Sequence, residues 1–98
     1  MEKNFLYIEL FDIYGELLTE KQKKIFSAYY IYDLSLSEIA EPDGKTRQSV
    51  HEAIKSVCDK LVQYEKTLKI YEKNQKLLAL SKELDEEIAV KINEIIGK

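Results

Sequence analysis

Apolar residues recur along this chain at the three- and four-residue spacing of helices that bury one face. The first such segment, residues 5–14, is apolar on nearly every side, and its polar positions Glu9 and Asp12 fall at helical spacing. A helix that covers a single core has a narrower apolar stripe. We therefore expect this helix, with Asn4 as a candidate cap and Gly15 at its end, to lie between the rest of its domain and another helix or subunit.

A second helix is predicted from Thr19 to about Ile31, because Thr19 followed by Gln22 is a capping-box signal. Its inward positions are Ile25, Phe26, Tyr29 and Tyr30. Aromatic residues at helical spacing are typical of a core, so we expect these tyrosines to pack inside with their hydroxyl groups at the surface.

The next two helices have the pattern of a helix-turn-helix motif. Ser35 with Glu38 forms another capping box, and Pro42 and Gly44 stop the short helix that it opens. Thr46 can cap the helix that follows. The apolar residues of that helix point to one side and are Val50, Ile54 and Val57; a polar set points elsewhere and consists of Arg47, Gln48, His51 and Lys55.

The apolar pattern changes direction in the second half of the chain, although no glycine or proline interrupts it there. Residues 50–71 carry one apolar stripe, and a second stripe consists of Leu77, Leu80, Leu84, Ile88, Ile92 and Ile95. On one continuous helix the two stripes would lie roughly 160° apart. We therefore predict a break in residues 73–76, between a long helix over 46–72 and a tail helix over about 76–96.

Together these elements predict an all-α fold, a helix-turn-helix bundle with a long fourth helix and an added C-terminal helix. The helix-turn-helix domain would take residues 1–72. Residues 73–98 would form an extension whose apolar face packs on residues 5–14, either within one chain or across a dimer.

Composition fits one globular domain, because the 98 residues are 45% hydrophobic and 34% charged. No apolar run approaches the roughly 20 residues of a membrane span, and the amino terminus lacks the features of a signal peptide. The single cysteine, Cys58, excludes an intrachain disulfide and a multi-cysteine metal site, and we interpret it as a buried helical thiol. We expect a cytoplasmic protein with no membrane insertion, metal or cofactor.

Charge and motif content narrow the function further. The net charge is −3, and residues 35–64 hold five acids and four bases, so a nucleic-acid contact there would depend on the local placement of Lys and Arg. The three glycines are isolated, which does not indicate a phosphate loop. The single histidine, His51, lies two helical turns from Cys58, too far for a Cys-His nucleophile pair. We predict a protein that is not an enzyme.

Four stretches together carry a family resemblance, namely Leu17–Gln22, Tyr29–Tyr30, Asp33–Glu41 and Arg47–Val50. On these residues the chain resembles the YlxM family of small bacterial proteins. That family is in turn similar to the promoter-reading C-terminal domain of sigma factors, with an added helical tail. The resemblance implies an all-helical fold, a cytoplasmic bacterial protein and an accessory or regulatory role in the signal recognition particle pathway.

Carried over position by position, the resemblance implies that the fourth helix faces a nucleic-acid groove. The candidate nucleic-acid-binding residues are Thr46, Arg47, Gln48, His51 and Lys55. Glu52 lies among them and would oppose phosphate. Asp43 and Lys45 stand where this motif normally has apolar residues that lock the two helices together, and Pro42 truncates the first of them. We therefore expect a looser turn than usual.

Two functions remain open. The first is a noncatalytic nucleic-acid-binding accessory or regulatory protein, with RNA of the signal recognition particle or duplex DNA as its ligand; a DNA-binding transcriptional regulator is included here. The second is a protein-interaction adaptor that keeps the helix-turn-helix shape and binds partners, such as particle components, through the apolar faces of its first and last helices. The wide apolar face of residues 5–14 also predicts a homodimer.

Overall fold

The computed structural model describes residues 3–97, and all of the regular structure in that range is helical. The α-helices are α1 (Leu6–Tyr14), α2 (Glu20–Tyr30), α3 (Leu36–Ala40), α4 (Arg47–Leu68), α5 (Ile70–Ser81) and α6 (Glu86–Ile96). Two short 3-10 helices, η1 (Gly15–Leu17) and η2 (Glu41–Asp43), follow α1 and α3. The predicted all-α fold with a long fourth helix is confirmed. In the described part of the chain, no helix is long and apolar enough to cross a membrane.

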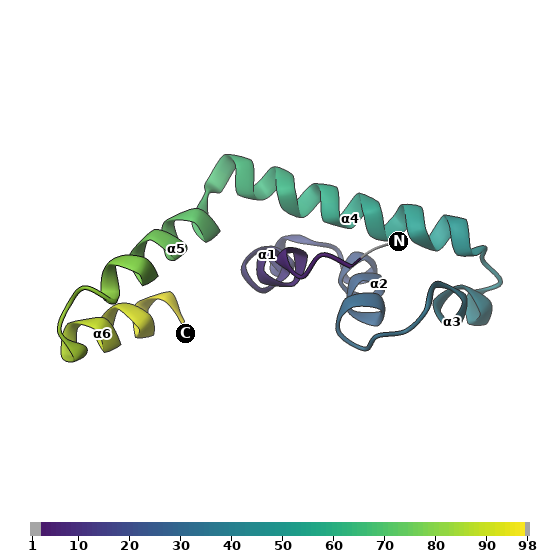
Figure 1. The fold of residues 1–98 in the computed structure, drawn as a ribbon. Helices are drawn as coiled ribbons and strands as arrows, with labels where there is room; N and C mark the ends of the chain where they lie inside the picture. The colour runs from purple at the N-terminus through teal and green to yellow at the C-terminus, as the bar shows by residue number, and fades with distance from the viewer. Residues whose placement is uncertain (1–2, 98) are drawn as a thin grey trace.

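The fold is built along α4, and α1, α2 and α3 all pack against this helix (Figure 1). The stripe that the sequence predicts over residues 50–71 is buried as far as Leu61, since Val50, Ile54, Val57 and Leu61 are each at most 2% exposed, whereas Leu68 is 43% exposed. Cys58 lies beside this stripe and is buried as expected, and its burial raises the pKa of the thiol to about 11. The three preceding helices thus share one core with α4 as its common wall.

Aromatic rings of α1 and α2 fill much of that core. Phe26 is fully buried and stacks on Phe11, with 4.4 Å between ring centroids, and on Tyr30, with 4.6 Å. Tyr29 is buried as well, which confirms that the aromatic cluster belongs to the core. The expectation for the hydroxyl of Tyr30 is wrong, because this group is buried beside Cys58. Within residues 3–97 it makes no hydrogen bond of ordinary distance and angle. Stacking holds the ring too deep for its hydroxyl to reach water, and this burial raises the pKa of Tyr30.

Three helix caps predicted from the sequence are present. Thr19 and Gln22 form a reciprocal capping box at the start of α2, and Ser35 and Glu38 form another at the start of α3. Thr46 caps α4 by accepting the N–H of the third helical residue at 3.0 Å. These local hydrogen bonds fix where each helix begins, so the order of elements in this half of the chain follows from short-range sequence signals.

α1 lies between two packing partners, as its wide apolar face predicts. Leu10 and Tyr14 are buried, α4 packs on this helix, and α5 contacts it as well. The cap position of α1 is Phe5 rather than the expected Asn4, and it makes no side-chain cap hydrogen bond. Asn4, one residue earlier, accepts the N–H of Leu6 on its side-chain oxygen at 3.0 Å. α1 ends before Gly15, which is itself buried.

The C-terminal third differs from the prediction. The long helix ends at Leu68 rather than at residue 72, and the break lies at Lys69 rather than in residues 73–76. Lys69 has a φ of 55°, a left-handed conformation that residues other than glycine and asparagine seldom adopt. The predicted single tail helix over about 76–96 is also wrong. The chain turns again after α5, and α6 packs against α5.

A cluster of hydrogen bonds between α1, α4 and α5 accounts for the break at Lys69. The Glu65 carboxylate accepts the Tyr14 hydroxyl at 2.6 Å and two N–H groups of the first turn of α5, each at 3.0 Å. The Tyr14 hydroxyl itself accepts a third N–H of that turn at 3.1 Å. These N–H groups have no carbonyl partner within their own helix, so the cluster caps α5 from outside. This hinge cluster consists of Tyr14, Glu65 and the N–H groups of Ile70, Tyr71 and Glu72.

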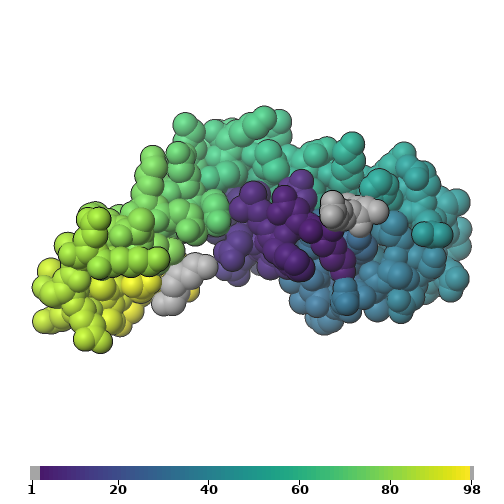
Figure 2. Space-filling model, in the orientation of Figure 1, coloured from purple at the N-terminus to yellow at the C-terminus, as the bar shows by residue number. Residues whose placement is uncertain are grey.

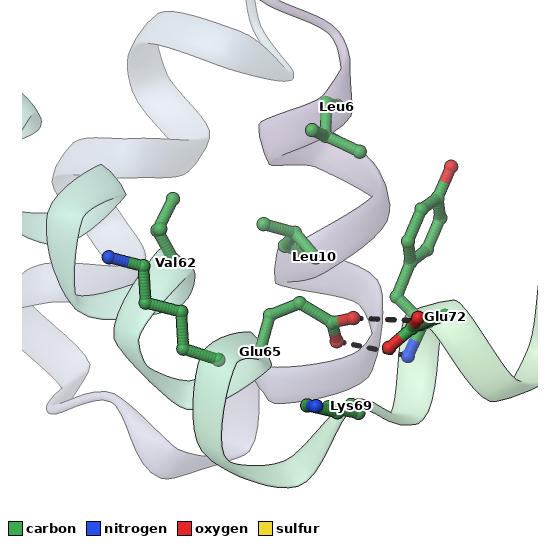
Figure 3. A pocket seen from close by; sticks show the side chains of 8 residues that line it. Leu6, Leu10, Val62, Glu65, Lys69 and Glu72 are labelled. Carbon is green, nitrogen blue, oxygen red and sulfur yellow. Dashed lines mark hydrogen bonds between the residues drawn. The ribbon is translucent and has the colours of Figure 1, made fainter.

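The hydrogen bonds of the hinge cluster favour the charged form of Glu65 and the neutral form of Tyr14. Burial raises the pKa of Glu65, but the hydrogen bonds from Tyr14 and from the start of α5 outweigh burial and leave the pKa below its usual value. Burial, together with the adjacent carboxylate, raises the pKa of Tyr14. Figure 3 shows Glu65 reaching toward the start of α5, beside a cavity of about 290 Å³ that Leu6, Leu10 and Val62 also line.

α5 and α6 form a helical hairpin, called the arm below, that projects beyond the helix-turn-helix bundle (Figures 1 and 2). The molecule measures 55 × 25 × 23 Å and has a radius of gyration of 16.5 Å, whereas a compact domain of this length would have about 13 Å. Asp85 caps α6 by accepting the N–H of Ile88 at 3.0 Å. The division into a domain of residues 1–72 and an extension of 73–98 stays a prediction; the arm itself begins after the hinge at Lys69.

Candidate nucleic-acid interface

A closed turn joins α3 to α4. The N–H of Gly44 bonds to the carbonyl of Glu41 at 3.1 Å, and the N–H of Lys45 bonds to the carbonyl of Ala40 at 3.0 Å. This pair of bonds is that of a Schellman motif, with Gly44 at the left-handed position, where its φ is 65°. Pro42 lies in η2, so the stop predicted for α3 is confirmed. The predicted looser turn is wrong, because the backbone of this turn is hydrogen-bonded.

The polar residues of the turn leave the packing between α3 and α4 intact. Asp43 and Lys45 are exposed, so they do not provide the apolar contacts that this motif normally has there. Ala40 and Val50 are instead buried at 2% and 1% exposure, and Ile39 is half-buried as part of the same core. The apolar contacts between α3 and α4 are made by residues just before and just after the turn. The turn itself can therefore carry two charged residues.

The five predicted contact residues lie in the first part of α4 or cap it. Thr46 is the cap, so its hydroxyl oxygen already accepts the N–H of Ser49. Arg47 and Lys55 are exposed, and His51 is half-buried. The guanidinium of Arg47 makes no hydrogen bond or ion pair with residues 3–97, which leaves it available to an incoming anion.

Gln48 is held by a neighbouring acid. Its amide nitrogen donates to a carboxylate oxygen of Glu52 at 3.2 Å, one helical turn further on. A base edge would have to replace this bond to reach the Gln48 amide. The carboxylate of Glu52 also adds negative charge to this part of α4, so phosphate is favoured on the side of Arg47.

Helix geometry gathers four of the candidates on one side of α4. Arg47, Gln48, His51 and Lys55 fall within an arc of about 100° at 3.6 residues per turn. Arg47 shares the direction of the buried residues Ile54 and Cys58 but lies in the first turn of α4, where it is exposed, and the rest of the arc turns toward solvent. The surface is called the α4 face below, and its members are Arg47, Gln48, His51 and Lys55.

The fold adds lysines to this region that were not among the predicted residues. A groove of about 420 Å³ between α2, α3 and the turn is lined by Lys21 and Lys24 of α2 and by Lys45 of the turn. Glu38 and Asp43 also line it, and the remaining lining is mostly apolar. Sequence reasoning had no signal for this grouping, because exposed lysines on a helix normally mark a solvated face and α2 lies far before the turn in the chain. Lys45 is adjacent to the cap of α4, so the lysines of the groove extend the positive charge from the α4 face toward α2.

No group of three His, Cys, Asp or Glu side chains is placed to hold a metal ion in residues 3–97. The cationic and N–H groups of this region are the guanidinium of Arg47, several ammonium groups and the first N–H groups of α4, and they lie near the carboxylates of Glu38, Asp43 and Glu52. Such groups bind phosphate oxygens, because the N-terminus of a helix carries partial positive charge and lysine and arginine supply full charges. The arrangement therefore fits binding to an anionic polymer.

Comparison with known proteins places the chain in a family. Residues 1–97 match the family model described as "Putative helix-turn-helix protein, YlxM / p13 like". A UPF0122 protein of Symbiobacterium thermophilum is 48% identical over 77 residues, which cover 79% of this chain and 72% of that protein. A UPF0122 protein of Clostridium perfringens is 42% identical over 88 residues, covering 90% of this chain and 79% of that protein. One from Ureaplasma urealyticum is 46% identical over 74 residues, or 76% of this chain and 75% of its own. The chain therefore belongs to the YlxM/p13-like helix-turn-helix family.

Proposed function

We propose that this protein is a noncatalytic nucleic-acid-binding regulatory protein that contacts its ligand through the α4 face. The observation that carries the proposal is the exposed, unpaired Arg47 at the amino terminus of α4, directly after a hydrogen-bonded helix-turn-helix turn. A phosphate at that position would meet both the guanidinium and the partial positive charge of the helix end. Membership of a helix-turn-helix family supports the same conclusion.

The side chains of the interface would contact different parts of the nucleic acid. Arg47 and Lys55 would neutralise phosphates on the α4 face, and Lys21 and Lys24 would contact the backbone where it passes α2. Gln48 would read a base edge after releasing Glu52, and His51 would contact the ligand beside it. Because the net charge is −3, we expect weak nonspecific binding. The contacts of Arg47 and the lysines with phosphate should make that binding fall as salt is raised.

We further propose that the protein acts in the cytoplasm as an accessory of the signal recognition particle, as a homodimer, with the RNA of the particle as its ligand. The family resemblance supports the particle, and the exposed apolar side chains of the arm support the dimer. Duplex DNA is the alternative ligand, because helix-turn-helix proteins place their second helix in the major groove.

Titrations of the protein into labelled particle RNA and into labelled duplex DNA, each at two salt concentrations, test the proposal. Arg47→Ala should weaken binding and lower the slope of log K against log salt by about 1 if Arg47 neutralises one phosphate. Lys60→Ala is the matched control, since Lys60 is exposed on α4 but lies outside the α4 face. The absence of binding to both ligands at low salt, or equal losses for the two variants, would refute the proposal.

A protein-interaction adaptor is the second candidate function. It is favoured by large apolar side chains at the surface, including Phe5 at 68% exposure near the start of α1. In that case Arg47→Ala would leave function unchanged, whereas Phe5→Ser would weaken binding to purified GTPases of the targeting pathway in a pull-down.

A further inference from the structure

The arm carries an apolar surface that the rest of the chain leaves uncovered. This surface, called the arm face, consists of Ile70, Leu77, Leu80, Leu84, Ile88 and Ile95. Each of these side chains is at least 37% exposed, and Ile95 is 84% exposed. Five of the six belong to the second apolar stripe of the sequence, and a regular stripe of this kind marks a packing face. The chain thus encodes a packing face for which residues 3–97 supply no partner.

The arm face lies on the side of the hairpin that points away from the bundle. At about 100° per residue, Leu80 lies about 140° around α5 from Gln75, and Ile88 lies about 180° around α6 from Gly97. Gln75 and Gly97 lie on the opposite side, where they line a small cavity together with residues of α1. Contact with α1 therefore cannot cover the arm face in this arrangement.

Two packed helices do not form a closed core, since each helix buries only the strip that touches the other. A second pair of helices on the open side completes a four-helix bundle, the common solution for helical hairpins. An identical arm is suited to this role, because it has the same apolar side chains at the same spacing.

The two ends of the arm carry opposite charge. The hinge end has three exposed lysines: Lys66, Lys69 and Lys73. Of the acids near them, Glu65 is engaged in the hinge cluster and Glu72 pairs with Lys76 at 3.5 Å, while Glu94 lies near the end of α6. The tip, residues 82–87, holds four acids and one lysine. Of these acids, Glu87 pairs with Lys91 at 3.7 Å and Asp85 caps α6, which leaves Glu83 and Glu86. An antiparallel pair of arms would bring each acidic tip to a basic hinge, whereas a parallel pair would bring like charges together.

We propose that the arm face binds the arm face of a second copy of this chain, antiparallel and about a twofold axis, so that two hairpins form a four-helix bundle. The inference rests on the homodimer of the proposed function and assigns its surface. Because the axis is twofold, every contact in the interface occurs twice, and a substitution acts twice as well.

Sedimentation velocity over a series of micromolar protein concentrations tests the surface. Leu80→Glu should raise the dissociation constant of the dimer by at least about 100-fold, because each copy would bury an unpaired carboxylate in the interface. Val90→Glu is the matched control: Val90 is 50% exposed and Leu80 49%, and both lie on the arm. Val90 lies about 160° around α6 from Ile88, a member of the arm face. That variant should remain dimeric. Far-UV circular dichroism checks that both variants keep the helical content of the wild type.

Charge reversal tests the orientation. Lys73→Glu should weaken the dimer, because it places an acid opposite the acidic tip of the second copy. Adding Glu86→Lys to the same chain should restore affinity if the arms are antiparallel. A double variant that binds no better than Lys73→Glu alone overturns the antiparallel arrangement.

The outcomes separate this inference from the proposals on which it rests. A wild-type protein that stays monomeric at high micromolar concentration overturns both the homodimer and the arm face. A dimer that Leu80→Glu and Val90→Glu leave equally intact overturns the arm face while the homodimer stands on another surface. Nucleic-acid binding is measured independently through Arg47→Ala.

Discussion

Replacing Tyr14 by Phe removes one oxygen from the hinge cluster and leaves the ring in place. The hydroxyl donates to the Glu65 carboxylate at 2.6 Å and accepts the N–H of Ile70 at 3.1 Å. Tyr14 as a whole is 1% exposed, so the phenyl ring of the variant would fill the same space. The substitution therefore tests the two hydrogen bonds without creating a cavity in the core.

The expected loss of stability follows from the two hydrogen bonds that the Tyr14 hydroxyl makes. A hydrogen bond to a charged group contributes about 1.5–3 kcal/mol, and a neutral one about 1 kcal/mol. The cluster is only partly buried, so water can satisfy some of the groups left behind. We therefore expect Tyr14→Phe to lower the free energy of unfolding by about 2 kcal/mol, which for a chain of this size lowers the Tm by about 10 °C.

Urea unfolding followed by circular dichroism measures this loss, and amide hydrogen exchange locates it. Exchange should accelerate most at the N–H groups of Ile70, Tyr71 and Glu72, which begin α5. Tyr64→Phe is the control, because the Tyr64 hydroxyl is 3.5 Å from its acceptor, the carbonyl of Leu17, and should contribute less than about 0.5 kcal/mol. Equal losses for the two variants would show that the hinge cluster does not hold the arm.

Two further predictions concern the same hinge. Lys69→Gly should raise the free energy of unfolding in urea by about 0.5–1 kcal/mol, since the left-handed backbone costs a residue with a side chain more than it costs glycine. Lys66→Gly, within the last turn of α4, should lower the free energy of unfolding by about 1 kcal/mol. Changes of the same sign in the two variants would contradict a strained backbone at Lys69. The Glu65 pKa is lower in the folded than in the unfolded protein, so its contribution is present above the unfolded-state pKa of about 4.3 and is lost as pH falls through the folded-state value. Tm measured between neutral and acid pH should therefore fall less steeply for Glu65→Gln, and parallel curves for variant and wild type would exclude Glu65 as a source of acid sensitivity.

The helix-turn-helix half of the chain was predictable because its signals are local. Each capping box is made by residues three positions apart, and Gly44 sits where the backbone needs a left-handed residue. The buried stripe of α4 follows from its own periodicity. None of these features needs information about a distant segment, so the sequence pattern and the structure agree.

The hinge could not be located in the same way. Lys69 is a good helix former, and nothing adjacent to it marks a break. The break is made by Glu65 and by Tyr14, which lies 51 residues earlier in the chain. The change of direction between the two apolar stripes correctly indicated that one straight helix was impossible. The position of the break depends on a tertiary contact, and the polar residues 73–76 therefore predicted it at the wrong place.

The candidate interface shows the same limit. Arg47 and Lys55 could be grouped from helical spacing, since both lie on α4. Lys21 and Lys24 join Lys45 only because α2 packs beside the turn. The acidic balance of residues 35–64 therefore understates the positive charge at the site, since two of its lysines come from another part of the chain.

α4 connects the two surfaces on which the proposed function depends. Its first turns carry the α4 face, and its last turn carries Glu65, which fixes the start of the arm. Its 22 residues form a rod about 33 Å long. If two arms pair antiparallel, the separation and orientation of the two α4 faces follow from this rod and from the angle at Lys69. The hinge cluster would then determine more than the stability of a single chain, because it would also set which pairs of sites on a nucleic acid the dimer can contact together.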